Sequence, residues 1–276
     1  MILSVSFGGW PETPLEQIAE LLNAVEVRNV EVVAAALTQG GRRPQQGQQW
    51  LRDHGVEVIA LSTQYPINKG EDAREAQQSL IAAIHLAAEL GIGRVNSYSG
   101  ASDLEDNQQA VARYLERMEP CVRAAEAARV PLMLENQIDV SPGNACARAA
   151  HVLRILRHFD SPWLRHTYDP ANYYGVGDDP IAAFPDLRPY IAYCHLKDVA
   201  LATPEMIERH PRFRHWDFPV RPMMAVPAGE GESPLAEAHR LLTESAYEGY
   251  ASNEPFVELG PLRRSVTHLR RLGVRG

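Results

Sequence analysis

Acidic and imidazole side chains follow four predicted strands in the second half of the chain. They come directly after the runs PLML, RHTY, IAYC and YASN, and they are Glu135, Asp169, His195 and Glu254. Three carboxylates that converge without neutralisation would raise one another's pKa values. A bound divalent cation removes this repulsion, and one imidazole with three carboxylates suits Mn²⁺, Mg²⁺, Co²⁺ or Zn²⁺. If the strand ends meet, the sequence predicts a centre for one divalent metal ion.

Such a centre favours proton transfer next to a carbonyl group. A metal that binds a carbonyl and an adjacent hydroxyl acts as a Lewis acid and stabilises an enediolate. A base on one face of the substrate and an acid on the other would invert a carbon centre. Proton relay between adjacent carbons would instead interconvert aldose and ketose. An enediolate can also expel a leaving group, so elimination stays open.

Several other polar or aromatic residues are candidates for contact with a substrate. Lys197 either holds a substrate oxygen or pairs with Asp198 or Asp169. Trp10 is a candidate wall for a sugar ring, and His215 and Arg221 are candidate contacts for an anionic or hydroxylated substrate. Further candidates at strand ends are Ser6, Gln64, Asn96 and Tyr98.

Strand-like and helix-like segments alternate along the whole chain. Short apolar runs predict strands at 2–6, 30–34, 56–61, 94–97, 131–134, 166–168, 191–194 and 250–252. Amphipathic segments predict helices at 13–25, 45–54, 71–90, 106–128, 145–159, 180–184, 234–245 and 262–272. Alternation predicts a parallel sheet with helices outside it, and eight units favour one closed (β/α)₈ TIM barrel. The carboxyl ends of the strands then surround one mouth, where the four residues would meet.

The chain shows no linker, repeat or low-complexity tract, which predicts a single domain over 1–276. Residues 201–231, after the seventh strand, are rich in Pro, Arg and His and predict a long irregular loop over the substrate. Gly91 is expected to end the helix before it in a left-handed conformation. No GxGxxG or GxxxxGK[ST] motif follows any strand, which argues against a nucleotide-binding fold.

The composition excludes several classes of protein. The net charge of -8 and the lack of a dense Lys/Arg run argue against nucleic acid as a partner. The three cysteines, Cys121, Cys146 and Cys194, lack CxxC spacing and are predicted to be buried free thiols. The segment MILSVSFGGW does not read as a signal peptide, and no apolar run approaches the roughly 20 residues that span a bilayer. A cytoplasmic protein without membrane contact is expected.

The motifs LMLEN, YDPANYY, CHLKD, VPAGEGESP and SNEPF occur in this order. In these motifs the chain resembles the xylose isomerase-like TIM barrel superfamily, the sugar phosphate isomerase/epimerase family, over nearly its whole length and most specifically over 131–255. The resemblance to its ketose epimerases implies that Glu135, Asp169, His195 and Glu254 bind one divalent metal ion. It further implies that Glu135 and Glu254 act as the acid/base pair. The GEG of 229–231 matches the family's turn into its seventh helix.

The chain departs from this family at one position. Many of the ketose epimerases carry a His three residues after the Asp of strand six, where this chain has Asn172, which can contact a hydroxyl but cannot carry charge. The departure leaves isomerase, dehydratase and lyase reactions open. DNA-repair endonucleases of the same superfamily use a three-metal cluster built from several His. This sequence shows no such set of metal-binding histidines, because His54, His85, His151 and His158 fall in helix-like segments and not at strand ends.

The sequence therefore predicts a divalent-metal-dependent isomerase or epimerase of a sugar or keto-sugar in carbohydrate metabolism. A metal-dependent dehydratase or lyase at the same site is the alternative, followed by a non-catalytic sugar-binding barrel and a DNA-repair endonuclease. The predicted partner is a small-molecule substrate. The strand ends carry no dense Lys/Arg cluster, which argues mildly against a phosphorylated substrate. Barrels of this type often pair, so a homo-oligomer is expected by analogy.

Overall fold

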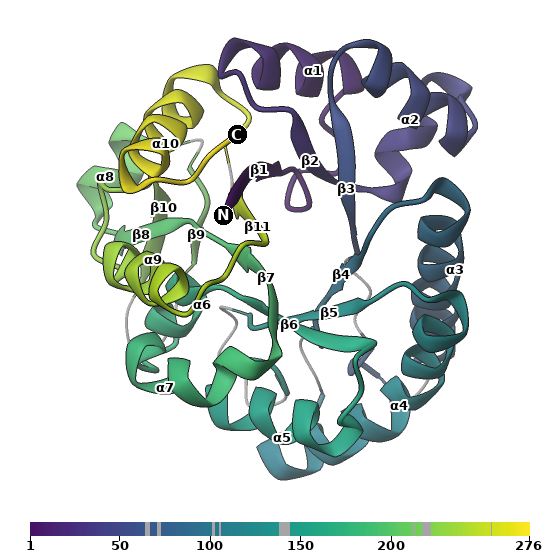
Figure 1. Cartoon of the computed structure of the whole chain (residues 1–276). Coiled ribbons are helices and arrows are strands. Elements are labelled where there is room, and N and C mark those ends of the chain that lie inside the picture. Colours follow the sequence, from purple (N-terminus) through teal and green to yellow (C-terminus); the bar gives the residue numbers. More distant parts are fainter. Residues whose placement is uncertain are drawn as a thin grey trace.

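Eight parallel strands close into a barrel in a computed structural model of the chain, as the sequence predicts (Figure 1). The structure describes residues 1–63, 67–70, 73–100, 103–104, 106–137, 144–211, 213–216, 222–254 and 256–276. The barrel strands are β1 (Ile2–Ser6), β2 (Asn29–Val33), β3 (Glu57–Ser62), β4 (Val95–Ser97), β5 (Leu132–Glu135), β6 (Leu164–Tyr168), β7 (Ile191–His195) and β11 (Tyr250–Asn253). The first strand pairs with both β2 and β11, and this closes the ring.

Helices surround the barrel and cover the outer face of its strands (Figure 1). The longer ones are α1 (Leu15–Ala24), α2 (Pro44–Asp53), α3 (Arg74–Leu90), α4 (Asn107–Ala128), α5 (Ala149–Phe159), α7 (Pro180–Leu187), α9 (Leu235–Glu244) and α10 (Leu259–Leu272). The shorter ones are η1 (Ala34–Gly41), α6 (Pro170–Gly175) and η2 (Arg188–Tyr190). Each long helix buries an apolar stripe, such as Leu80, Ile84 and Ala87 of α3. Burial of these stripes against the strands is the main favourable contribution to folding.

Element ends follow local hydrogen bonding. Gly91 ends α3 with a φ of 67°, which confirms its predicted left-handed conformation. The predicted helix over 145–159 begins only at Ala149, because Asn144 Oδ1 accepts a hydrogen bond from the Cys146 amide (2.9 Å) and holds a turn there. The three cysteines are free and buried, as predicted.

Short strands among the described residues between Asp198 and Val226 form a small antiparallel sheet, where the sequence predicts an irregular loop over 201–231. It consists of β8 (Asp198–Leu201), β10 (Met223–Val226) and β9 (His215–Trp216), in the order β8-β10-β9, together with α8 (Pro204–Arg209). The two longer strands pair from Val226 opposite Asp198 to Met223 opposite Leu201. They are joined by a long connection without a two-residue turn signal, so the sequence alone does not show that they pair.

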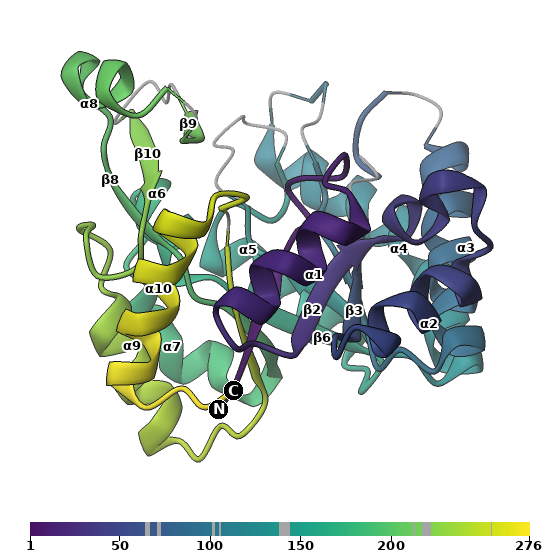
Figure 2. The same cartoon turned by 90° about the horizontal axis from the view of Figure 1, so that it is seen from above.

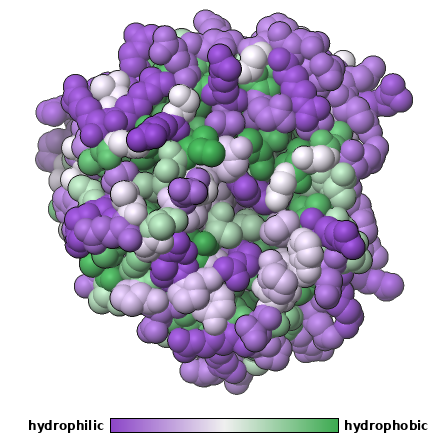
Figure 3. Space-filling model, viewed as in Figure 1, coloured by the Kyte–Doolittle hydropathy of each residue, from purple (hydrophilic) through white to green (hydrophobic). Residues whose placement is uncertain are grey.

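The small sheet rises above one end of the barrel, and both termini lie at the other end (Figure 2). The carboxyl ends of the barrel strands therefore face the same side as α8 and β9. On the opposite face, where the chain begins and ends, hydrophilic side chains form the rim and apolar ones appear between them (Figure 3). Within the described ranges, no helix is both long and apolar enough to cross a membrane.

Candidate metal centre

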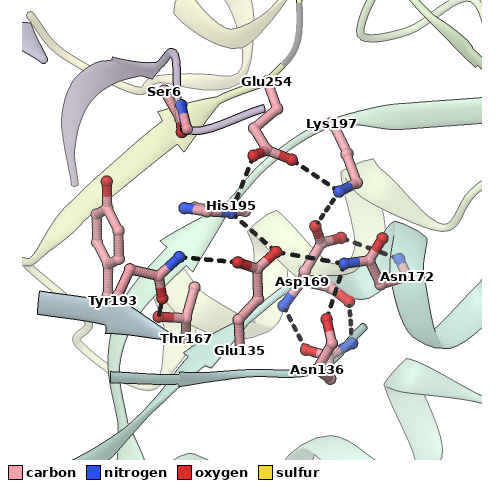
Figure 4. A network of polar contacts seen from close by, with 12 residues as sticks. Ser6, Glu135, Asn136, Thr167, Asp169, Asn172, Tyr193, His195, Lys197 and Glu254 are labelled. Carbon is pink, nitrogen blue, oxygen red and sulfur yellow. Dashed lines mark hydrogen bonds and ion pairs between the residues drawn. The ribbon is translucent and has the colours of Figure 1, made fainter. Parts of the chain in front are cut away.

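The four residues at the strand ends meet in one cluster (Figure 4). One ligand atom from each of Glu135, Asp169, His195 and Glu254 lies within 4.8 Å of the others. His195 Nδ1 lies 3.2 Å from Glu135 Oε1 and 3.7 Å from Glu254 Oε1. Three carboxylates and one imidazole therefore offer donor atoms to a single point at the mouth of the barrel.

The carboxylate of Asp169 has two different neighbours. Its Oδ1 accepts a hydrogen bond from the Asn172 amide (3.0 Å) and caps α6, with Pro170 at the first helical position. Its Oδ2 lies 2.8 Å from Lys197 Nζ inside the cluster. The DPAN motif is thus a helix start that also fixes the direction of a candidate metal ligand.

Two asparagines next to candidate ligands hold neighbouring strand ends together. Asn136 donates to the Asp169 carbonyl (2.8 Å) and accepts from the Asp169 amide (3.0 Å), which joins the ends of β5 and β6. Asn253 donates to the Leu196 carbonyl (2.9 Å) and joins the ends of β11 and β7. These hydrogen bonds between side chains and backbone fix the positions of the candidate ligands relative to one another.

Lys197 belongs to the cluster, whereas its neighbour Asp198 does not. Lys197 Nζ lies 2.8 Å from Asp169 Oδ2 and 2.7 Å from Glu254 Oε2, so it pairs with Asp169, one of the two predicted alternatives, and also with Glu254. Asp198 accepts hydrogen bonds from the amides of Gly229, Gly231 and Ser233. It therefore anchors the GEG turn that precedes α9.

Glu31 is a member of this network that the sequence analysis missed. Its Oε2 accepts a hydrogen bond from Tyr193 Oη (2.7 Å) and lies 3.0 Å from His195 Nε2, with Glu31 and His195 fully buried. We assign the proton of neutral His195 to Nε2, which leaves Nδ1 to face the other carboxylates. A metal-binding histidine commonly has such a carboxylate partner, which fixes its ring. The available signal was a glutamate inside the apolar run Val30–Val33, because a buried charge requires a partner.

Glu135 is oriented by a second pair of buried side chains. Asn96 donates to Glu135 Oε2 (2.8 Å), and Thr167 Oγ1 donates to Asn96 Oδ1 (2.7 Å). Asn96, a candidate for the mouth in the sequence, therefore lies buried behind the carboxylate.

The cluster carries excess negative charge. The three buried carboxylates of Glu31, Glu135 and Asp169 and the partly buried carboxylate of Glu254 surround His195 and Lys197. Two cationic side chains cannot neutralise four carboxylates, and a divalent cation would supply the missing charge. Oxygen-rich ligation with one imidazole fits a hard or borderline divalent ion.

Burial and charge move the pKa values of these groups in different directions. Burial opposes protonation of His195, but the carboxylates of Glu135, Glu31 and Glu254 outweigh it and raise its pKa well above the usual value. Burial raises the pKa of Asp169 to about 6, although Lys197 acts against the rise. Burial also acts to raise the pKa of Glu254, but Lys197 and His195 outweigh it and lower that pKa to about 2.

Of the other residues predicted to contact a substrate, only some lie at the cluster. Asn172 lies at the cluster and donates to the Asn136 carbonyl (2.7 Å) and to Glu135 Oε1 (3.3 Å). Trp10 is partly buried and its ring lies next to the Arg214 guanidinium, and His215 is an exposed residue of β9. Gln64 and Arg221 lie outside the described residues.

A small cavity of about 90 Å³ opens over the cluster. Its lining includes Glu135, Glu254, Asn172 and Lys197, and also Arg214, which the sequence analysis did not select. His215 is not among the described lining residues, because the segment before β9 turns Arg214 to the cavity instead.

The chain belongs to the xylose isomerase-like TIM barrel family, whose profile matches residues 15–272. Among curated proteins it is 22% identical over 153 residues to a 3-dehydroshikimate dehydratase from Bacillus anthracis. That match covers 55% of this chain and 53% of the relative, so it spans about half the length of the relative.

Solved structures share the fold at low sequence identity. The probable 3-DHS dehydratase of petrobactin synthesis from Bacillus anthracis has a TM-score of 0.75 and 17% identity, covering 98% of this chain and 99% of its own. An L-ribulose 3-epimerase has a TM-score of 0.75 and 17% identity, covering 99% and 94%. The IOLI protein with a bound zinc atom has a TM-score of 0.74 and 14% identity, covering 99% and 98%. At these identities the likeness shows the fold alone.

Metal affinity is expected to increase with pH. In the metal-free protein the raised pKa of His195 keeps both ring nitrogens protonated at neutral pH. A metal ion must displace the proton on Nδ1 before it can bind there. Loss of one proton makes affinity rise about 10-fold per pH unit, and more steeply below about pH 6, where Asp169 is also protonated. Calorimetric titration with Mn²⁺ between about pH 6 and pH 8 measures the slope. His195→Ala should lose the metal, and exposed His85→Ala should behave as wild type; a flat profile would contradict the assignment.

Glu31→Gln is expected to weaken metal binding by about 10- to 100-fold while the barrel stays folded, because the hydrogen-bonded partner of His195 loses its charge. The same titration measures the loss, and circular dichroism checks the fold. Tyr193→Phe removes only the hydrogen bond to Glu31 and should cost less, whereas Glu126→Gln on the exposed face of α4 serves as the matched control. Wild-type affinity in Glu31→Gln would show that His195 needs no partner.

Proposed function

We propose that this protein is a divalent-metal-dependent isomerase or epimerase that acts on a sugar or keto-sugar. The observation that carries the proposal is the placement of Glu135 and Glu254 beside the same imidazole nitrogen, at 3.2 and 3.7 Å. In Figure 4 the two carboxylates approach His195 from different sides. A substrate between them would have one carboxylate near each of its faces, as proton removal and return require.

Glu135, Asp169, His195 and Glu254 would hold the metal ion, and the zinc in the IOLI protein is in line with this role. When bound, the ion would supply Lewis-acid polarisation of a carbonyl and an adjacent hydroxyl. Glu31 would keep the His195 ring in place, and Asn96 would do the same for the Glu135 carboxylate. These contacts fix the acid/base pair before a substrate arrives, so little reorganisation is needed.

Glu254 is in the ionised form that a proton acceptor requires. Its carboxylate stays ionised at neutral pH, because Lys197 and His195 lower its pKa to about 2 against the effect of burial. Proton transfer can then run from a substrate C–H to Glu254, with Glu135 as its partner on the other side. Lys197, at 2.7 Å from Glu254 Oε2, would hold that carboxylate and also lie within the cavity.

Asn172 offers a contact for a substrate hydroxyl. Its Nδ2 donates to the Asn136 carbonyl, which sets the orientation of the amide. Its Oδ1 is buried without a hydrogen-bond partner among the described residues. A buried acceptor without a partner costs about 1–3 kcal/mol, and a hydroxyl donor would recover that cost. Asn172 would therefore recognise a hydroxyl group.

Dehydration of a hydroxylated ketone is the second candidate function. The similarity to 3-dehydroshikimate dehydratase in sequence and to the probable 3-DHS dehydratase in structure favours it. Both reactions begin with removal of a proton next to a carbonyl. They differ only in whether the proton returns or a hydroxide leaves.

Glu135→Gln and Glu254→Gln are each expected to lower turnover by about 10²- to 10⁴-fold, because an amide cannot transfer the proton. The fold should be retained, because glutamine has nearly the same shape as glutamate. Single-turnover assays on metal-loaded protein measure the loss. Glu248→Gln is the matched control, because Glu248 is exposed in the turn before β11. Full activity in either active-site variant would remove that residue from the acid/base pair.

Incubation with L-ribulose and with 3-dehydroshikimate in D₂O separates the two candidate functions. An isomerase or epimerase should return a product of unchanged composition that carries solvent deuterium on carbon. A dehydratase should release a product that has lost one water. Mass spectrometry with NMR detects both results. A metal-loaded protein that gives neither result with either compound would argue for a barrel that binds ligands without turnover.

A further inference from the structure

Arg214 adds a positive charge to the cavity from outside the metal centre. Lys197 and Arg214 are the two cationic side chains among the described residues that line it. Lys197 pairs with Asp169 and Glu254 inside the cluster. Arg214 belongs to the segment between α8 and β9, and the residue is exposed at the rim.

Two parts of the chain hold Arg214 at this position. The Ala225 amide donates to the Arg214 carbonyl (2.8 Å), which fixes its backbone to the small sheet. Its guanidinium carbon lies 5.8 Å from the centre of the Trp10 ring, within range of a cation–π contact. A Cβ on Gly9 would lie 2.2 Å from Arg214 Nη1, so the absence of a side chain at Gly9 leaves room for the guanidinium.

The charge of Arg214 reaches the reacting groups. Burial, and then Lys197 and His195, have the larger effects on the pKa of Glu254, and Arg214 adds to its lowering. Burial and Glu135 raise the pKa of Tyr98 to about 12, while Arg214 acts to lower it. A cation this close to an acidic cluster offsets the repulsion that an anionic substrate would meet there. A neutral sugar would gain no such benefit.

We infer that Arg214 is a specificity residue that binds the carboxylate of a hydroxylated keto acid, whose carbonyl and hydroxyl groups face the metal centre. The inference rests on the proposed function and names its substrate class. A guanidinium can bind a carboxylate through two parallel N–H···O hydrogen bonds, and the same fork also fits a phosphate. A phosphate group carries more negative charge and would need a second cation, but the other lining cation among the described residues is engaged by Asp169 and Glu254.

Binding of matched acids and esters tests this inference. The probes are 3-dehydroshikimate and 2-keto-D-gluconate, each beside its methyl ester, which differs from the acid mainly in charge. Calorimetry on metal-loaded wild type should show an acid bound about 10- to 100-fold more tightly than its ester. Arg214→Gln should bring this ratio to about one, and Arg214→Lys should retain part of it.

Two further variants separate the contact from general effects of charge. Arg209→Gln, on the exposed last turn of α8, removes one positive charge nearby and should keep the wild-type ratio. Gly9→Ala keeps every charge but displaces the guanidinium, and should lower the ratio. Failure of both acids to bind, equal binding of acid and ester by wild type, or an acid preference that survives in Arg214→Gln would overturn the inference.

Deuterium exchange on the same preparations distinguishes failure of this inference from failure of the proposed function. Exchange into L-ribulose that does not depend on Arg214, with no preference for acids, would leave the enzyme function standing and remove the substrate class. An acid preference that depends on Arg214, without exchange or loss of water, would leave the carboxylate contact standing and remove the proposed reaction.

Discussion

The grouping of four carboxylates, three of them buried, around one imidazole is the constraint on which the site depends. Glu31, Glu135 and Glu254 face His195, and Asp169 faces Lys197. Taking charges out of water costs several kcal/mol for each ion unless partners and hydrogen bonds compensate. The two cations compensate in part, and a divalent cation would complete the balance. The same excess of negative charge that makes the cluster costly would favour binding of a metal ion.

The barrel supports this cluster because its strands converge. Parallel strands bring their carboxyl ends to one mouth, so residues distant in the chain become neighbours. Asn136 and Asn253 then tie adjacent strand ends through backbone hydrogen bonds, and Asp169 caps the short helix that follows it. Side chains held in this way need little rearrangement when a metal or substrate arrives.

The proposed chemistry and the proposed selectivity would come from different parts of the molecule. The strand ends hold the candidate metal ligands and the candidate acid/base pair, whereas the segment between α8 and β9 carries Arg214. A scaffold of this kind can keep its proton-transfer machinery while its connections change the substrate.

The sequence by itself determined the barrel and the set of candidate ligands. Regular alternation of apolar runs and amphipathic segments predicts eight strand–helix units, and charged residues directly after buried strands mark the mouth. Both are local patterns of residue spacing, so they can be seen without coordinates. Residues 201–231 lacked such a pattern, because β8 and β10 pair with each other although a long connection separates them.

Only the tertiary structure decided which further residues belong to the site. Glu31 lies on β2, far in sequence from His195, and its role depends on a contact across the barrel. Arg214 and Gly9 meet from opposite parts of the chain, and the choice of Arg214 over His215 depends on how the small sheet is oriented. Such contacts are set by packing between distant elements, which leaves no periodic signal in the sequence.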